Sequence, residues 1–164
     1  MLLELLAWTG NYLQNPPQPA LFHPQLIPDL LFGVGFYFGW VLAWWILLRG
    51  FRFTLVETVV LMGLYGVIVE QNGAVLIAGL AALPLGVLLW VYVAAAYGGA
   101  AGLAYLLAGG ERVPMGKRTH WIKFLLAFVL LYLCVQVTFL LWGMFVDSIG
   151  LIPPPRPIRE APLW

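Results

Sequence analysis

The stretch WIKFLLAFVLLYLCVQVTFLLWGMFV, residues 121–146, decides the fold class because it holds a single charged side chain, that of Lys123. About 20 consecutive apolar residues are enough for a helix to cross a bilayer. The stretch does not alternate polar and apolar positions, as the strands of a transmembrane barrel do. It therefore predicts a membrane-spanning helix.

The composition of the whole chain extends this prediction. Of its 164 residues, 63% are hydrophobic and 9% are charged, and the mean hydropathy is +0.94. Soluble domains carry about 25% charged residues. We therefore predict an all-α, polytopic membrane protein. The net charge of +1 gives no electrostatic footprint for nucleic acid, so nucleic acid is excluded as a partner.

Three other apolar stretches complete a predicted bundle of four transmembrane helices. Residues 29–48 and 54–70 each have the length of one span. Residues 74–110 carry no charge over 37 positions, which is long for one span and short for two. We predict one long third helix there, kinked near Pro84. The alternatives are a re-entrant piece at Ala94–Gly110 or a fifth span.

The basic residues favour four spans over five. With four spans, six of the eight basic residues fall on one side of the membrane: Arg49, Arg52, Arg112, Lys117, Arg118 and Lys123. The positive-inside rule makes that side cytoplasmic, so both termini are predicted to be non-cytoplasmic. A fifth span would move the basic residues of 112–123 to the opposite side from Arg49 and Arg52.

The two ends of the chain differ from its middle. Residues 1–28 combine a short apolar segment with five prolines, which predicts a brief interfacial helix and an ordered loop. Residues 150–164 form a second proline-rich segment. The predicted organisation is therefore 1–28 as the interfacial region, 29–149 as the bundle, and 150–164 as a C-terminal tail.

Small residues at i, i+4 spacing predict close helix contacts. The pairs are Gly35/Gly39, Ala95/Gly99 and Gly98/Gly102. Packing inside this bundle is the simpler interpretation, and a seam for a partner helix is the alternative. Gly63, Gly66 and Glu70 also share one helix face, where we expect the second span to touch its neighbours.

Carboxylates inside apolar helices are the first candidates for chemistry, because a charge in a bilayer is costly. Glu57 and Glu70 lie 13 positions apart on one predicted helix, which separates them by about 20 Å and excludes a two-carboxylate glycosidase pair. Glu57 lies near the cytoplasmic boundary, close to Arg49 and Arg52. Its carboxylate is either functional or extended toward that boundary.

The outer ends of the spans carry a second group of polar residues. The candidates are Asp29, Glu70 and Asp147, with His23 beside them and Arg156 or Arg159 as counter-ions. If they converge, they could serve acid–base chemistry, proton transfer or a hard cation. The alternative is that they only cap helix ends in the headgroup region. The candidate catalytic residues are thus Glu57, Glu70, Asp29 and Asp147.

Candidates for cofactor binding are aromatic or imidazole groups. Trp40 and Trp44 share a helix face at i, i+4 spacing and could line an apolar pocket, and His23 is the third candidate. The two histidines, His23 and His120, are predicted on opposite sides, so this chain alone should not hold a bis-histidine haem. With Cys134 as the one cysteine, we predict no metal site, and the cofactor stays unidentified.

The sequence determines the structural class of the protein more closely than its function. The chain has none of the familiar hydrolase, nucleotide-binding or thiol-redox motifs. Two hypotheses follow. The first is a non-catalytic subunit or scaffold of a membrane complex, in contact with lipid or pigment, whose partners are other membrane subunits or further copies of the chain. The alternative is a membrane-embedded enzyme or proton-coupled carrier for a hydrophobic substrate. Whether the chain is an enzyme stays open.

Overall fold

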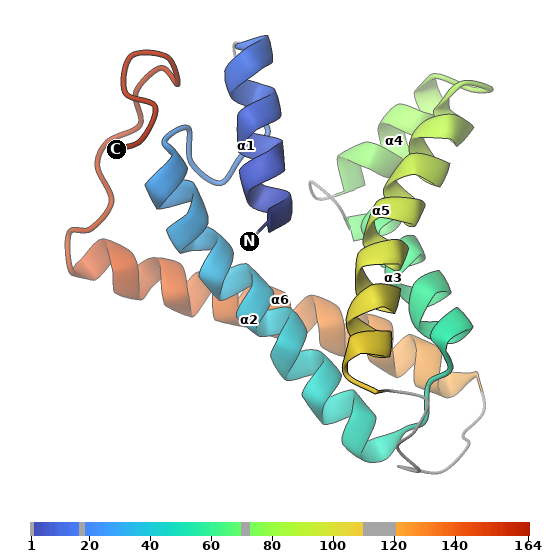
Figure 1. The fold of residues 1–164 in the computed structure, drawn as a ribbon. Helices are drawn as coiled ribbons and strands as arrows, with labels where there is room; N and C mark the ends of the chain where they lie inside the picture. The colour runs from blue at the N-terminus through green and yellow to red at the C-terminus, as the bar shows by residue number, and fades with distance from the viewer. Residues whose placement is uncertain (1, 17–18, 70–72, 110–120) are drawn as a thin grey trace. The chain divides into compact units, whose positions relative to one another are not determined.

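The computed structural model describes residues 2–16, 19–69, 73–109 and 121–164. They form six helices: α1 (Leu2–Gln14), α2 (Leu26–Gly50), α3 (Leu55–Val69), α4 (Ala74–Ala81), α5 (Gly86–Leu107) and α6 (Ile122–Ser148) (Figure 1). No strand occurs within these ranges. The predicted all-α class is confirmed for this part of the chain.

Three of the helices, α2, α5 and α6, are long and apolar enough to cross a membrane. Helices α3 and α4 qualify only together, as one broken span bent by 79°. The described residues therefore provide three or four candidate spans, which supports association with a membrane. A bundle of four spans and an interfacial position for α1 stay predictions.

Contacts divide the chain into two compact units. The first unit contains Met1–Trp44 and Leu133–Trp164, and the second contains Trp45–Tyr132. Helices α2 and α6 therefore each contribute residues to both units. These units are defined by contacts, so they do not test the predicted division by membrane position at residues 28 and 149.

The run 74–110 differs from the prediction. Helix α4 ends at Ala81 and α5 begins at Gly86, with a cis Leu83–Pro84 bond between them. The Trp90 indole N–H donates to the Val75 carbonyl at 3.2 Å, although one continuous helix would separate these residues by about 22 Å. The chain thus folds back as a helical hairpin. A single helix kinked at Pro84 is wrong, and residues 94–107 lie within the unbroken α5 rather than in a separate re-entrant piece.

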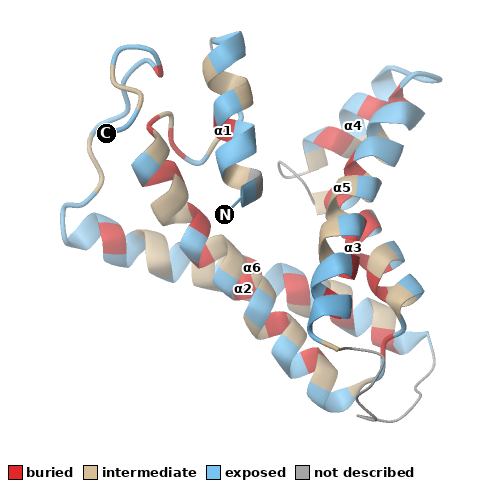
Figure 2. Cartoon of the chain, in the orientation of Figure 1, coloured by how far each residue is buried: buried red, intermediate tan, exposed pale blue. Residues whose placement is uncertain are grey.

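Glycines bring α3 and α5 into backbone contact. A Cβ atom on Gly63 would lie 3.0 Å from the Ala94 carbonyl oxygen, and one on Gly98 would lie 2.6 Å from the Val59 carbonyl oxygen. Gly66 and Gly102 also meet the opposite helix, whereas Gly99 meets nothing within 4 Å. The predicted contact face of the second span is therefore confirmed at Gly63 and Gly66. In Figure 2 buried positions, in red, are interspersed with exposed ones, in pale blue, along the helices.

Within the first unit, α2 and α6 pack through small residues. A Cβ atom on Gly39 would lie 2.6 Å from the Val135 Cα, and one on Gly35 would lie 2.6 Å from the Trp142 Cβ. The Trp142 indole N–H donates to the Leu31 carbonyl at 2.6 Å, which ties the two helices together. Of the three predicted small-residue pairs, Gly35/Gly39 and Gly98/Gly102 therefore serve packing inside this chain.

Candidate functional site

Glu57 lies in a hydrogen-bonded turn that begins α3. The Thr54 hydroxyl accepts a hydrogen bond from the Glu57 backbone N–H at 3.2 Å, and the Glu57 Oε2 accepts one from the Thr54 backbone N–H at 2.8 Å. This reciprocal arrangement is a capping box, which satisfies two amides that a helix start leaves without partners. The sequence Thr-Leu-Val-Glu at 54–57 encodes it directly.

The other oxygen of Glu57 binds Lys123. Lys123 Nζ lies 2.6 Å from Glu57 Oε1 and donates to the Arg52 carbonyl at 3.0 Å. The lysine is only 3% exposed, and its ammonium lies 5.2 Å from the centre of the Phe53 ring and 5.1 Å from that of Phe124. The ammonium is thus surrounded by an ion pair, a carbonyl and two aromatic rings.

Sequence reasoning missed this pair, because it sought a partner for Glu57 among the nearby arginines. Arg49 instead lies over the Trp45 ring, 3.7 Å from its centre. A signal was present in the predicted topology, which placed Glu57 and Lys123 near the same membrane face. Because both oxygens of Glu57 are engaged, the group acts as a helix cap and an anchor for the start of α6.

A second polar cluster lies in the first unit, around His23. The His23 Nδ1 accepts a hydrogen bond from the Gln25 backbone N–H at 3.2 Å, and the Nε2 lies 3.2 Å from the Pro153 carbonyl oxygen. Together these contacts require a neutral ring with its proton on Nε2. Burial lowers the pKa of His23, although the hydrogen bond between its Nε2 and the Pro153 carbonyl opposes the shift.

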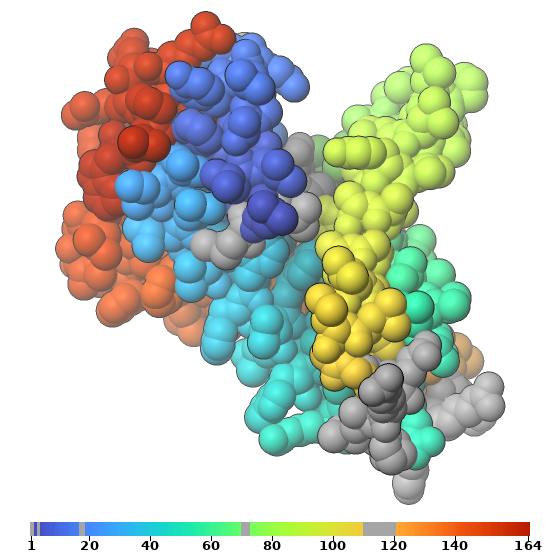
Figure 3. All heavy atoms as spheres, in the orientation of Figure 1, coloured from blue at the N-terminus to red at the C-terminus, as the bar shows by residue number. Residues whose placement is uncertain are grey.

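The C-terminal tail, residues 150–164, completes this cluster. The Gln25 side-chain amide donates to the Arg156 carbonyl at 2.8 Å and accepts from the Arg156 backbone N–H at 3.3 Å. Figure 3 shows the tail seated against the residues that precede α2.

The tail also caps α2. The Leu26 and Ile27 backbone amides donate to the carbonyls of Pro162 and Leu163, each at 3.0 Å. The first amides of a helix lack partners within the helix. The tail therefore supplies acceptors that a capping side chain would otherwise provide.

Asp29 lies in the same cluster and is fully buried. Its Oδ1 accepts a hydrogen bond from the His23 backbone N–H at 3.1 Å, whereas its Oδ2 has no hydrogen-bond partner among the described residues. Glu4 of α1 is a neighbouring negative group, and it accepts a hydrogen bond from the Tyr37 hydroxyl at 2.9 Å. Asp29 is thus a buried carboxyl group that the backbone N–H groups of the loop before α2 hold in place.

The other members of the predicted outer cluster are placed differently. Asp147 is exposed near the end of α6, and Glu70 lies outside the described residues. The guanidinium of Arg159 donates to the Leu13 carbonyl at 3.3 Å, and Arg156 contributes its backbone. No three His, Cys, Asp or Glu side chains of the described ranges are grouped so that they could hold a metal ion.

The candidate aromatic pair lies along α2. Trp40 and Trp44 are both half-buried. The Trp40 ring packs against Phe36 at 5.7 Å and against Tyr37 at 6.0 Å between centres. Further ring contacts link this group to Phe22 and Phe139. Trp40 is therefore part of an aromatic cluster, and cofactor binding at Trp40 and Trp44 stays a prediction.

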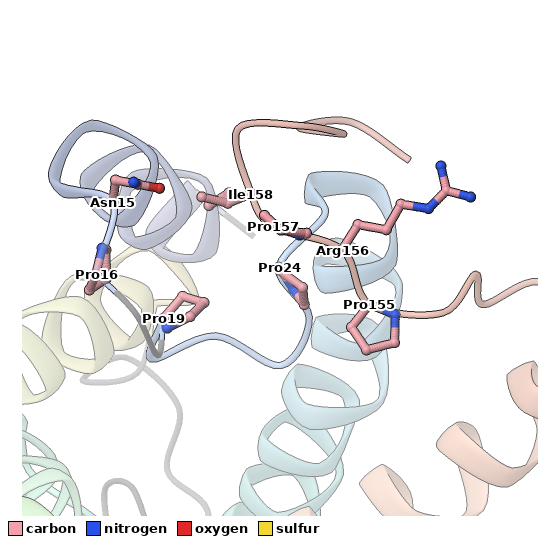
Figure 4. A pocket seen from close by; sticks show the side chains of 8 residues that line it. All are labelled: Asn15, Pro16, Pro19, Pro24, Pro155, Arg156, Pro157 and Ile158. Carbon is pink, nitrogen blue, oxygen red and sulfur yellow. The ribbon is translucent and has the colours of Figure 1, made fainter.

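A hollow of about 590 Å³ lies between the tail and the loop that precedes α2 (Figure 4). Its lining residues are Asn15, Pro16, Pro19, Pro24, Pro155, Arg156, Pro157 and Ile158. Figure 4 shows the Arg156 guanidinium extending away from the other lining side chains. Asp29, Glu57 and Asp147 are not among these lining residues.

Comparison with known proteins gives no relative. No family model, curated protein or solved structure matches the chain.

Proposed function

We propose that the chain is a non-catalytic subunit or scaffold of a membrane complex. The observation that carries this proposal is the engagement of Glu57. This carboxylate uses one oxygen for Lys123 and the other for the backbone of Thr54. A general acid or base must instead present its proton-transferring atom to a substrate. The charge in α3 thus serves to hold the fold together.

The surface of the helices supports the same proposal. Large apolar side chains of α5 are exposed, among them Tyr92 at 72% and Leu107 at 80%. In a bilayer such side chains contact lipid tails or apolar partner helices. We propose an orientation with both termini on the non-cytoplasmic side, where the proline-rich tail would meet neighbouring subunits.

Gentle-detergent purification followed by mass spectrometry of bound proteins, lipids and pigments tests the proposal. We expect a second membrane subunit, or further copies of the chain, to co-purify in a fixed ratio. The Asp147→Asn variant should retain these partners, since that carboxylate is exposed at a helix end. Recovery of a monodisperse single chain would contradict the proposal.

A membrane-embedded enzyme or proton-coupled carrier is the second candidate, and Asp29 favours it. Its Oδ2 is buried without a hydrogen-bond partner among the described residues, and buried ionisable groups in membrane proteins often transfer protons. If this hypothesis holds, Asp29→Asn abolishes a turnover or uptake activity while the purified assembly stays intact. Unchanged activity in that variant excludes a role for this carboxylate.

A further inference from the structure

The His23 ring joins the loop before α2 to the C-terminal tail. Its Nε2 meets the Pro153 carbonyl at 3.2 Å, and its Nδ1 accepts from the Gln25 N–H at 3.2 Å. Gln25 is fully buried, and its side chain holds both backbone groups of Arg156. The position of Gln25, and with it the main anchor of the tail, therefore depends on the ring.

Protonation of the ring is incompatible with this arrangement. An imidazolium carries a proton on both nitrogens, so Nδ1 would become a donor facing the donor N–H of Gln25. The Gln25 amide would lose its acceptor, and the ring would hold a charge while only 6% exposed. An unsatisfied buried donor and a buried charge are both unfavourable. Displacing Gln25 lets water reach both its backbone N–H and the charged ring, and it breaks the hydrogen bonds between the Gln25 side chain and Arg156.

The surrounding charges do not compensate for an imidazolium. Both ring contacts are with backbone groups rather than with a carboxylate. Asp29 meets the backbone N–H of His23 through its Oδ1, and Glu4 of α1 lies close to Asp29. On the tail, Arg156 contributes its backbone and the Arg159 guanidinium binds the Leu13 carbonyl. Burial is therefore the largest influence on the pKa of His23, and it lowers that pKa.

We propose that the C-terminal tail is a strap that mild acid releases, with protonation of the His23 ring as the switch. In the docked state the tail caps the Leu26 and Ile27 amides and buries the Ile158 side chain. In the released state these amides and that apolar side chain become available to solvent or to a partner. This inference does not depend on the proposed function, since it concerns contacts within one chain.

The direction of the effect follows from linkage. A histidine whose pKa is lower in the docked state than in the released state binds fewer protons when docked. Docking is therefore strongest above the ordinary histidine pKa of about 6.5. It weakens as the pH falls below that value and through the lowered pKa of His23.

Distance measurement between two spin labels tests the strap. Gln14 and Glu160 are both exposed in the first unit, and both are replaced by cysteine for labelling in a Cys134→Ser background, in detergent. We expect a narrow distance distribution at about pH 7.5 and a broad, longer one at about pH 5, with the docked fraction reduced at least threefold. An unchanged distribution in the otherwise wild-type chain overturns the proposal.

Variants separate His23 from other titrating groups. His23→Gln keeps an amide donor for Pro153, and His23→Asn keeps an acceptor for the Gln25 N–H; neither titrates. Both variants retain Asp29 and Glu4, and we expect the docked fraction to become independent of pH. The matched control His120→Gln, which removes the other histidine of the chain, should release the tail as the wild type does. Acid release that persists in both His23 variants overturns the proposal.

A reference for the released state is also available. Gln25→Ala removes both side-chain bonds to Arg156, so its distance distribution should be broad at every pH. A narrow, docked distribution in this variant at about pH 7.5 would overturn the role given to Gln25.

Discussion

At the scale of single residues, the Glu57–Lys123 pair is asymmetric, because the Lys123 side chain is 4% exposed whereas the Glu57 side chain is 28% exposed. Breaking a buried ion pair leaves an uncompensated charge, and the penalty depends on how well water reaches that charge. The two partners should therefore respond differently to substitution.

We predict that Glu57→Gln destabilises the chain more than Lys123→Met does. Glu57→Gln leaves the buried ammonium without its counter-ion and should lower the free energy of unfolding by about 2–4 kcal/mol. Lys123→Met leaves a carboxylate that still caps Thr54 and is partly hydrated, so its effect should be roughly half as large. Denaturation in detergent, including the double variant, measures both values and the coupling. A larger loss for Lys123→Met would contradict this account.

The capping box gives a second prediction at this scale. Thr54→Ala removes the hydroxyl that accepts from the Glu57 N–H and should destabilise α3 by about 1 kcal/mol. Thr54→Ser keeps the hydroxyl and serves as the matched control, with a change close to zero. Equal losses in the two variants would show that the methyl group, and not the cap, is responsible.

The sequence indicated that the Glu57 charge is costly in an apolar stretch, but not which residue pairs with it. A charge in an apolar stretch is visible in one dimension. Its counter-ion is 66 positions away, and only the packing of α6 against the start of α3 brings Lys123 to it. For His23, the sequence predicted proximity to Asp29 and the tail arginines, but not that Arg156 acts through its backbone, because backbone contacts leave no side-chain pattern.

At the scale of elements, the α4–α5 hairpin depends on two glycines. A Cβ atom on Gly86 would lie 1.8 Å from the Gly79 carbonyl oxygen, so the two helices can approach only if position 86 has no side chain. The sequence predicted an interruption near Pro84, and the helices do break there. It did not predict the reversal of direction, since proline and glycine signals mark where a helix ends but not the direction of the next one.

We predict that Gly86→Ala opens the hairpin. The new methyl group overlaps backbone rather than a movable side chain, so the loss should be about 2–3 kcal/mol or more. Gly99→Ala, in the same helix with nothing within 4 Å, is the matched control and should change stability by less than about 1 kcal/mol. Thermal unfolding in detergent compares the two; similar losses would contradict the hairpin contact.

At the scale of the whole chain, the two contact units should respond independently to damage at the C-terminus. The tail contacts the loop that precedes α2, and these residues all belong to the first unit. The second unit has its own α3–α5 contacts. The sequence predicted one bundle flanked by two peripheral ends. It could not show how the ends join, because that depends on backbone hydrogen bonds between residues more than 130 positions apart.

We predict that deleting residues 152–164 loosens the first unit alone. The deletion removes the acceptors of the Leu26 and Ile27 amides and the partners of His23 and Gln25. Hydrogen exchange at residues 19–27 should accelerate by one to two orders of magnitude, while exchange in α3 and α5 stays within about twofold. Acceleration of equal size in α3 would show that the units are not independent.

The pairing of residues 23–27 with residues 153–163 also sets an order of events during synthesis. Residues 45–132 can make their mutual contacts as soon as α5 and the start of α6 have left the ribosome. The first unit must wait until residues 162 and 163 emerge, because their carbonyls complete α2. Until then the amides that begin α2 remain open to water or to a chaperone. Residues 23–27 are therefore synthesised well before the residues that complete their hydrogen bonds.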